Sequence, residues 1–310
     1  MITFENVGKA FAGTVAVADL SLTIDEGEFV VVIGRSGSGK STLLKLVNRL
    51  VEHDRGRILF AGEEIRRFEP EALRRRMGYA IQSVGLFPHW TVEQNIATVP
   101  QLLGWSRART RDRVTELLEL LHLTPATYRR RFPHQLSGGQ QQRVGVARAL
   151  AGDPAVLLMD EPFGSLDPVT RESLQQEIAR IHDASGKTIL LVTHDIDEAL
   201  RLATRIVLLD RGRVVQVGSP REILTRPATA FVSDFVGRSD IGIKLLGLEM
   251  VSAYVRRDET APGEAIASSA SLREALSMLV ARHVDRLPVA DEDGRPIGAI
   301  ALADLTRPPP

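Results

Sequence analysis

Short apolar runs alternate with amphipathic helical patterns over residues 1–237 of the chain. Residues 29–33, 156–159 and 188–192 are apolar or β-branched runs, which suit strands that are covered on both faces. Between such runs, apolar residues recur at helical spacing among charged ones, as in residues 107–123. Strands that alternate with helices predict an α/β fold with a mainly parallel sheet.

The pattern changes after residue 237. Residues 238–261 show no clear period and are interpreted as a linker. Residues 262–310 then contain a helical pattern and two short apolar runs, which a turn at residues 291–294 joins. The sequence therefore predicts two domains, residues 1–237 and residues 262–310, the second of them a small α+β unit.

Composition narrows the class of protein. The chain has 310 residues, 44% of them hydrophobic and 25% charged, which is typical of a folded protein of about two domains. Basic and acidic residues both number 39, so no net charge attracts nucleic acid, and there is no Cys for disulfides or thiolate metal sites. The apolar runs are far shorter than the ~20 residues of a membrane-spanning helix, and residues 1–11 do not resemble a signal peptide. These features predict a cytoplasmic protein that does not itself cross a membrane.

A glycine-rich loop follows the apolar run at residues 29–33. It fits the pattern G-x-x-x-x-G-K-[ST] with the residues Gly34, Arg35, Ser36, Gly37, Ser38, Gly39, Lys40, Ser41 and Thr42. The glycines allow backbone N–H groups to surround phosphates, while Lys40 reaches the β and γ oxygens and the Ser41 hydroxyl binds Mg²⁺. A Gly/Ser turn without function is the alternative, but the position between a strand and a helix favours nucleotide binding.

Polar residues follow three further apolar runs. Asp160 and Glu161 come after residues 156–159, at the carboxyl edge where open α/β sheets bind ligands. We expect Asp160 to hold Mg²⁺ and Glu161 to act as the general base for an attacking water. His194 could contact the γ-phosphate, and Gln82 could contact Mg²⁺ and the water, but by themselves both residues fit an ordinary surface position equally well.

A third motif makes the pattern specific. The sequence Leu-Ser-Gly-Gly-Gln at residues 136–140 lies within the longer segment 132–150, and Ser-Leu-Asp follows at residues 165–167. Together with the loop and the Asp-Glu pair, this order of motifs resembles the ATP-binding cassette (ABC) ATPases over residues 1–237. The resemblance implies a P-loop NTPase fold with a helical subdomain, and a homodimer that binds two ATP molecules between its subunits.

The resemblance also implies roles for individual residues. Phe11 would stack on the adenine of ATP, and Gln82 would couple the site to a membrane partner. The expected catalytic residues are Glu161, His194 and Gln82, and the expected Mg²⁺ ligands are Ser41, Gln82 and Asp160. The residues expected to contact the ATP of the partner subunit are Ser137, Gly138, Gly139, Gln140 and Asp167.

Two further segments resemble importers. Residues 85–96 resemble the importer form of the segment that receives a permease helix, although a turn before a capped helix fits the same residues. Residues 264–305 resemble one cystathionine-β-synthase (CBS) repeat, notably at residues 287–289 and 294–300. An ATPase followed by such a unit is similar to the importers of osmoprotectants such as glycine betaine, carnitine, choline and proline betaine.

This second resemblance implies the partners and leaves alternatives open. The partners would be integral membrane permease subunits and a separate substrate-binding protein, with no nucleic acid, and the chain would lie peripherally on the cytoplasmic face of the inner membrane. The single CBS-like repeat would regulate the ATPase, pair with its copy across the dimer, or serve only as a packing unit. One alternative is an importer ATPase for another small solute, such as an amino acid. The other is a soluble ABC ATPase without a permease, but that class usually has two cassettes or a long coiled-coil insertion, which this sequence lacks.

Overall fold

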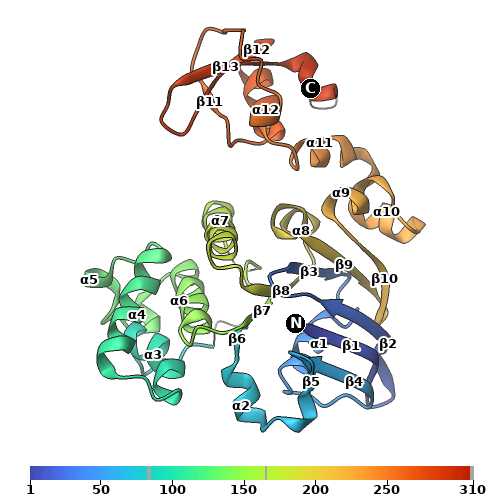
Figure 1. Ribbon diagram of the computed structural model, residues 1–310, viewed down its shortest axis with the longest axis vertical. Coiled ribbons are helices and arrows are strands. Elements are labelled where there is room, and N and C mark those ends of the chain that lie inside the picture. Colours follow the sequence, from blue (N-terminus) through green and yellow to red (C-terminus); the bar gives the residue numbers. More distant parts are fainter. Residues whose placement is uncertain (82–84, 165, 308–310) are drawn as a thin grey trace. The chain divides into compact units, whose positions relative to one another are not determined.

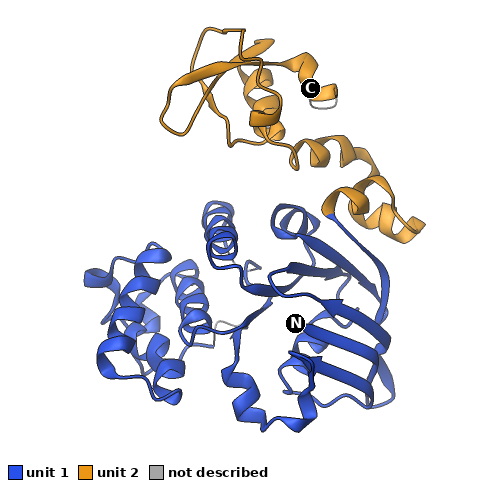
Figure 2. Ribbon diagram, in the orientation of Figure 1, with its two compact units in different colours: residues 1–219 blue, residues 220–310 orange. Residues whose placement is uncertain are grey.

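The computed structural model describes residues 1–81, 85–164 and 166–307 (Figure 1). The chain divides into two compact units, Met1–Ser219 and Pro220–Pro310 (Figure 2). The sequence analysis placed its first boundary at residue 237 instead, and the division of the chain into folding domains stays a prediction.

A central sheet organises the first unit. Within the described residues it has six strands, in the spatial order β10 (Arg213–Gly218), β9 (Arg205–Asp210), β3 (Phe29–Gly34), β8 (Thr188–Thr193), β7 (Val156–Asp160) and β6 (Met77–Ala80). Strands β9, β3, β8, β7 and β6 pair in parallel, whereas β10 runs antiparallel to β9. All residues of β3, β7 and β8 are buried, as expected for parallel strands that are covered on both faces. The α/β fold is therefore confirmed, and the carboxyl ends of β3, β8 and β7 meet at one edge of the sheet.

An antiparallel sheet packs beside the central one. Its strands, in spatial order, are β2 (Thr14–Ile24), β1 (Ile2–Phe11), β4 (Arg55–Phe60) and β5 (Glu63–Glu64). Helix α1 (Lys40–Val47) contributes Leu43, Leu44 and other buried residues to one apolar cluster that also includes residues of β1, β2, β3, β4 and β7. Because this core holds α1 from Leu43 to Val47, and α1 directly follows the loop after β3, the start of α1 lies at the edge of the central sheet.

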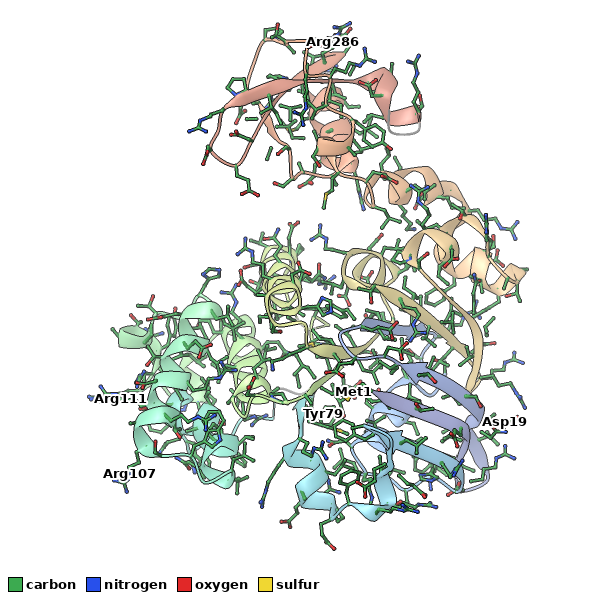
Figure 3. The ribbon with its side chains drawn as sticks, viewed as in Figure 1. Met1, Asp19, Tyr79, Arg107, Arg111 and Arg286 are labelled. Atoms are coloured by element: carbon green, nitrogen blue, oxygen red, sulfur yellow. The ribbon has the colours of Figure 1, made fainter. Side chains whose placement is uncertain are left out.

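A group of helices is inserted between β6 and β7 (Figure 1, green). Its members are α3 (Val92–Leu102), α4 (Arg107–Leu120), α5 (Pro125–Tyr128) and α6 (Gly138–Leu150). Helix α6 contacts both α3 and α4, and the charged residues of α4 lie on the outside, as Figure 3 shows for Arg107 and Arg111. This group is the helical subdomain that the sequence analysis predicted. The remaining helices of the first unit are α2 (Pro70–Arg75), α7 (Pro168–Ser185) and α8 (Ile196–Leu202).

The second unit combines short helices with a small sheet. Its helices are α9 (Pro220–Thr225), α10 (Ala230–Val236), α11 (Ile241–Leu246) and α12 (Leu272–Arg282), and its strands are β11 (Ile266–Ala267), β12 (Arg286–Ala290) and β13 (Pro296–Ala301). Strand β12 pairs in parallel with β11 and antiparallel with β13. The segment interpreted as a linker contains α11, and its residues Val251 and Tyr254 are buried in the core of this unit. Their spacing follows a single 3₁₀ turn (Val251–Ala253), which is why the sequence shows no helical or strand period there.

None of the helices in the described part of the chain combines the length and the apolar character that crossing a bilayer requires.

An ion pair fixes the end of the second unit. The guanidinium of Arg256 donates to Asp304 through Nε, 2.9 Å from Oδ2 and 3.1 Å from Oδ1, and the Ala301 N–H donates to Oδ2 over 2.9 Å. Burial acts to raise the pKa of Asp304, but the hydrogen bonds and charge of Arg256 outweigh it and leave the pKa below its usual value. Asp304 is 8% exposed, so its two partners are hard for water to replace.

We therefore expect the substitution Asp304→Asn to lower the melting temperature of the second unit by about 5 °C at pH 7. Since the folded pKa lies below the unfolded value of about 3.9, the stabilisation is present above that value and disappears as the pH falls through the folded pKa. Calorimetry of the full chain at several pH values measures both effects. Asp293→Asn, which alters an exposed pair with Arg295 in the same unit, serves as the control and should leave the melting temperature unchanged. A melting temperature that Asp304→Asn leaves unchanged would contradict the prediction.

Candidate functional site

The phosphate loop joins the end of β3 to the start of α1. The N-cap residue of α1 is Gly39, with φ 102°, so no side chain covers the N–H groups of the first turn. A Cβ atom at Gly39 would lie 2.3 Å from the carbonyl oxygen of Ala16, and one at Gly34 would lie 2.3 Å from that of Leu209. Glycine is therefore required at both positions by close backbone approach, and the N–H groups at this helix start are directed toward the loop, as in an anion site.

Lys40 lies inside this loop. Its Nζ donates to the carbonyl oxygens of Gly34 (2.8 Å) and Arg35 (3.1 Å), and the residue is only 5% exposed. Burial lowers the pKa of Lys40, while the nearby charges of Glu161 and Asp160 act in the opposite direction. The ammonium group is thus held by weak neutral acceptors at the place where phosphate oxygens, which are charged acceptors, would bind it more strongly.

Two oxygen-bearing side chains that could bind a metal ion, one from α1 and one from β7, meet beside Lys40. The Ser41 hydroxyl of α1 donates to Oδ1 of Asp160 over 2.8 Å, and Asp160 is the buried last residue of β7. Burial raises the pKa of Asp160 above its ordinary value, although the hydrogen bond from Ser41 lowers it. A divalent cation would supply the missing positive charge, and a hydroxyl with a carboxylate is the hard-oxygen set that Mg²⁺ accepts. The predicted third ligand, Gln82, lies outside the described residues, as does Ser165.

Tyr79 of β6 also reaches Asp160, which the sequence analysis did not foresee. Burial raises the pKa of Tyr79, and the nearby charge of Asp160 raises it further, so the phenol lies close to this carboxylate. Figure 3 shows this residue well inside the first unit. In the β6–β7 register Tyr79 lies opposite Leu158, whose side chain shares a face with that of Asp160. A tyrosine at the penultimate position of a strand carries no signal by itself, because the contact depends on which strand is the neighbour.

Glu161 and His194 meet at the same edge of the sheet. Glu161 follows β7 with φ 44°, an uncommon backbone conformation for a residue other than glycine, and its N–H donates to the Val192 carbonyl oxygen over 3.0 Å. His194 follows β8, and its Nδ1 lies 3.2 Å from Oε2 of Glu161. The structure therefore brings together the two residues that were predicted as general base and γ-phosphate contact, and their catalytic roles stay predictions.

The segment at residues 136–140 caps α6. Ser137 is the N-cap: its Oγ accepts from the Gln140 N–H (3.3 Å), and Oε1 of Gln140 accepts from the Ser137 N–H (3.1 Å). Gly138 is exposed, and an added Cβ there would meet nothing within 4 Å, whereas one at Gly139 would lie 2.5 Å from Thr170. Gln140 also donates from Nε2 to the Tyr128 hydroxyl over 3.2 Å, while Ser137 and Gly138 are exposed, so this surface is available to a partner.

Asp167 caps the neighbouring helix α7. Its side chain accepts from the Thr170 N–H over 3.0 Å, and hydrogen bonds from Thr170 lower the pKa of Asp167. Because Thr170 also contacts Gly139, the structure places the start of α7 next to the start of α6. The residues predicted to contact a partner's ATP, residues 137–140 at the start of α6 and Asp167 at the start of α7, thus lie on one surface.

An aromatic pair marks the segment at residues 85–96. Phe87 and Trp90 are 45% and 39% exposed, with ring centroids 4.6 Å apart. The fully buried Asn95 shapes this loop: its Oδ1 accepts from the Phe87 N–H (2.8 Å), and its Nδ2 donates to the carbonyl oxygens of Phe87 and Trp90 (both 3.2 Å). The sequence analysis gave Asn95 no role. Its position on the apolar face of a helical pattern could have shown that this polar side chain is buried and needs hydrogen-bond partners.

Comparisons with known proteins agree with this geometry. The ABC transporter family model matches residues 17–164, and the CBS domain model matches residues 255–308. The chain is 63% identical over 305 residues to the glycine betaine uptake system ATP-binding protein YehX of Escherichia coli (strain K12), with 98% of this chain and 99% of that protein covered. The chain belongs to the ABC transporter family of ATP-binding proteins. This ABC protein is also 46% identical over 292 residues to the glycine betaine/carnitine/choline transport ATP-binding protein OpuCA of Bacillus subtilis (strain 168), covering 94% of this chain and 76% of that protein.

Solved structures support the same assignment of the fold. A dimeric structure of the ATP-binding cassette MJ0796 bound to ADP and Pi has a TM-score of 0.65 to this ABC protein and is 34% identical to it, with 71% of this chain and 99% of that chain covered. The predictions of an ATP-binding cassette and of an appended CBS unit are confirmed. The assignments of individual site residues stay predictions. Most of the described ones lie at one sheet edge or at the starts of α6 and α7, whereas Phe11 lies at the end of β1, opposite Thr14 of β2.

Proposed function

We propose that this ABC ATPase hydrolyses ATP to drive the uptake of glycine betaine or related quaternary-ammonium osmoprotectants. The observation that carries the proposal is the 63% identity to a glycine betaine uptake protein along nearly the whole of both chains. The cassette alone does not select the solute, since a sulfate/thiosulfate import ATP-binding protein of Thermosynechococcus vestitus (strain NIES-2133 / IAM M-273 / BP-1) is 47% identical, over only 76% of this chain.

The described residues support a mechanism at the carboxyl edge of the central sheet. The N–H groups of the phosphate loop and Lys40 would bind the phosphates, and Ser41, Asp160 and Gln82 would hold Mg²⁺. When bound, Mg²⁺ neutralises charge on the β and γ oxygens. Oε2 of Glu161 would accept the proton of the attacking water, with His194, 3.2 Å away, holding that carboxylate in place.

The complete site requires a second copy of the chain. Ser137, Gly138, Gly139, Gln140 and Asp167 would contact the ATP held by the partner's phosphate loop. Ser137 and Gly138 at the start of α6 are exposed, and a helix N-terminus suits an anion. The dimeric MJ0796 structures support this arrangement. ATP would then bind the closed dimer better than the open form, so that hydrolysis favours opening.

The other partners would be integral membrane permease subunits and a separate substrate-binding protein. The exposed Phe87–Trp90 pair, held by Asn95, offers the permease an apolar surface in the segment 85–96, which follows Gln82 in the sequence. The chain would then lie peripherally on the cytoplasmic face of the inner membrane and bind no nucleic acid.

Reconstitution tests the proposal. The ATPase is assembled with its permease in vesicles, and the phosphate release rate is measured with the binding protein empty or loaded with glycine betaine, choline or an amino acid. We expect a severalfold stimulation by glycine betaine or another quaternary amine. Stimulation by an amino acid without a quaternary ammonium group, and by no quaternary amine, would assign a different solute.

A further inference from the structure

The hairpin that carries Phe11 loses one of its neighbours before it ends. Strand β1 pairs with β4 as far as Gly8, which lies opposite Arg55. Beyond Gly8, residues 9–11 pair with β2 but, within the described residues, no longer with β4. Phe11 lies opposite Thr14 of β2. The tip of the hairpin therefore has an edge on the β4 side, where backbone N–H groups need another acceptor.

Asp54 occupies that edge. Its Oδ2 accepts from the backbone N–H of Ala10 and its Oδ1 accepts from Nζ of Lys9, each over 2.7 Å. Its own N–H donates to the carbonyl oxygen of Gly8 over 2.9 Å. The hydrogen bonds from Lys9 and Ala10 lower the pKa of Asp54, which is therefore ionised at neutral pH. One carboxylate thus continues, by two charge-assisted hydrogen bonds, the pairing that β4 no longer provides.

Lys9 extends this contact to Phe11. The ammonium group that Asp54 holds lies over the Phe11 ring, 5.2 Å from its centroid. The Lys9 side chain is only 14% exposed, whereas Phe11 is 45% exposed. Lys9 therefore lies over one face of the ring, and Phe11 stays exposed enough for a planar ligand to stack on it.

The hairpin also lies against the phosphate loop. The carbonyl oxygen of Ala16 in β2 is the atom that a Cβ at Gly39 would meet at 2.3 Å, and the Ala18 N–H donates to the Gly212 carbonyl oxygen over 2.8 Å. The stem of the hairpin is thus fixed beside the site of the phosphates. The tip of the hairpin is held by other contacts. Among the described residues, Asp54 provides the hydrogen bonds that hold the tip from the β4 side.

We propose that Asp54 is a positioning residue for ATP, which holds the Phe11 ring at the distance from the phosphate loop that adenine requires. The inference rests on the proposed function, because it takes Phe11 as the surface on which adenine stacks. Asp54 lies outside the phosphate loop, in the loop between α1 and β4, and its side chain is 50% exposed. A half-exposed ion pair adds little to folding stability, so its removal should affect the adenine rather than the fold.

Affinities for two ligands test this role. We measure Kd for Mg·ATP and for Mg·tripolyphosphate, which lacks the base, by calorimetry on the full chain. Asp54→Ala should weaken ATP binding about fivefold, a part of what stacking of one base contributes, and should change tripolyphosphate binding less than twofold. Asp54→Asn, which keeps an acceptor for Ala10 but loses the charge facing Lys9, should fall between Asp54→Ala and the wild type.

The matched control is Glu5→Gln. Glu5 and Arg57 form an exposed pair across the same two strands, β1 and β4, away from the hairpin tip, and its loss should leave both affinities unchanged. Phe11→Ala should weaken the binding of ATP but not that of tripolyphosphate. Adding Asp54→Ala to Phe11→Ala should cause no further loss of ATP affinity, since a positioning residue acts through the ring.

Three results would overturn the inference: equal weakening of ATP and tripolyphosphate binding by Asp54→Ala, full additivity with Phe11→Ala, or ATP binding by Asp54→Ala that equals the wild type. Failure of the wild-type chain to bind ATP would instead overturn the proposed function, so the two failures are distinguishable.

Discussion

Replacement of Glu161 by glutamine is expected to reduce ATP hydrolysis by about 10²–10⁴-fold while ATP binding persists. Glutamine keeps the shape of the side chain and the backbone hydrogen bond from residue 161 to Val192, but it cannot accept the proton of the attacking water. In the proposed mechanism the loop and Lys40 bind the phosphates, so the affinity for ATP should not fall. Steady-state phosphate release and equilibrium binding of ATP, both on the purified chain, measure the two effects.

A second glutamate–histidine contact provides the control. Glu177 of α7 lies 2.9 Å from Nε2 of His122, far along the chain from the phosphate loop and away from the carboxyl edge of the sheet. Glu177→Gln should leave hydrolysis within about twofold of the wild type, because it changes a similar pair without touching the proposed base. If Glu161→Gln retained more than about a tenth of the turnover, Glu161 would not be the general base.

The site was largely predictable where its chemistry is local in the sequence. The phosphate loop is one contiguous segment, and its glycines are required by contacts that any chain in this conformation would make, such as the approach of Ala16 to Gly39. Asp160 and His194 follow apolar runs, and parallel strands end at the same edge of a sheet. Strands β7 and β8 are neighbours in the sheet, so the shared edge brings Glu161 and His194 together.

Contacts between distant segments were not predictable in the same way. Asp54 meets Lys9 and Ala10 across 45 and 44 residues, respectively, and this depends on where β4 stops pairing with β1. Tyr79 meets Asp160 because β6 happens to be the neighbour of β7. Hydrophobic periodicity indicates which face of a strand is buried, but it does not give strand order or the residue at which a ladder ends.

The surface formed by the starts of α6 and α7 leads to a test of the dimer. Gly138 is exposed and has free space where a Cβ would be, so Gly138→Asp should fold normally. An acidic residue in the first turn of α6 even suits the helix dipole. In the closed dimer, however, the new carboxylate would face the γ-phosphate of the partner's ATP, and we expect hydrolysis to fall at least about 100-fold.

A second variant removes the other half of the site. Lys40→Met abolishes the two hydrogen bonds that Nζ makes in the loop and the charge that would bind the phosphates. Loss of charge-assisted hydrogen bonds to the triphosphate should weaken ATP binding and hydrolysis about 100-fold or more. Each variant alone is therefore expected to be nearly inactive. Gly138→Asp damages the residues that a chain offers to its partner's ATP, and Lys40→Met damages the phosphate loop that binds a chain's own ATP.

Mixing the two inactive variants should restore hydrolysis. In a heterodimer one site combines both defects, while the other combines the intact phosphate loop of one chain with the intact residues 136–140 of its partner. Random exchange at equal concentrations makes about half of the dimers mixed, each with one intact site of two, so activity should return to roughly a quarter of the wild-type value. If each chain instead used its own residues 136–140, no combination would contain an intact site and the mixture would stay as inactive as its components. Phosphate release measured against the mixing ratio, with a maximum expected near equal amounts, therefore distinguishes a site shared between two chains from a site complete within one.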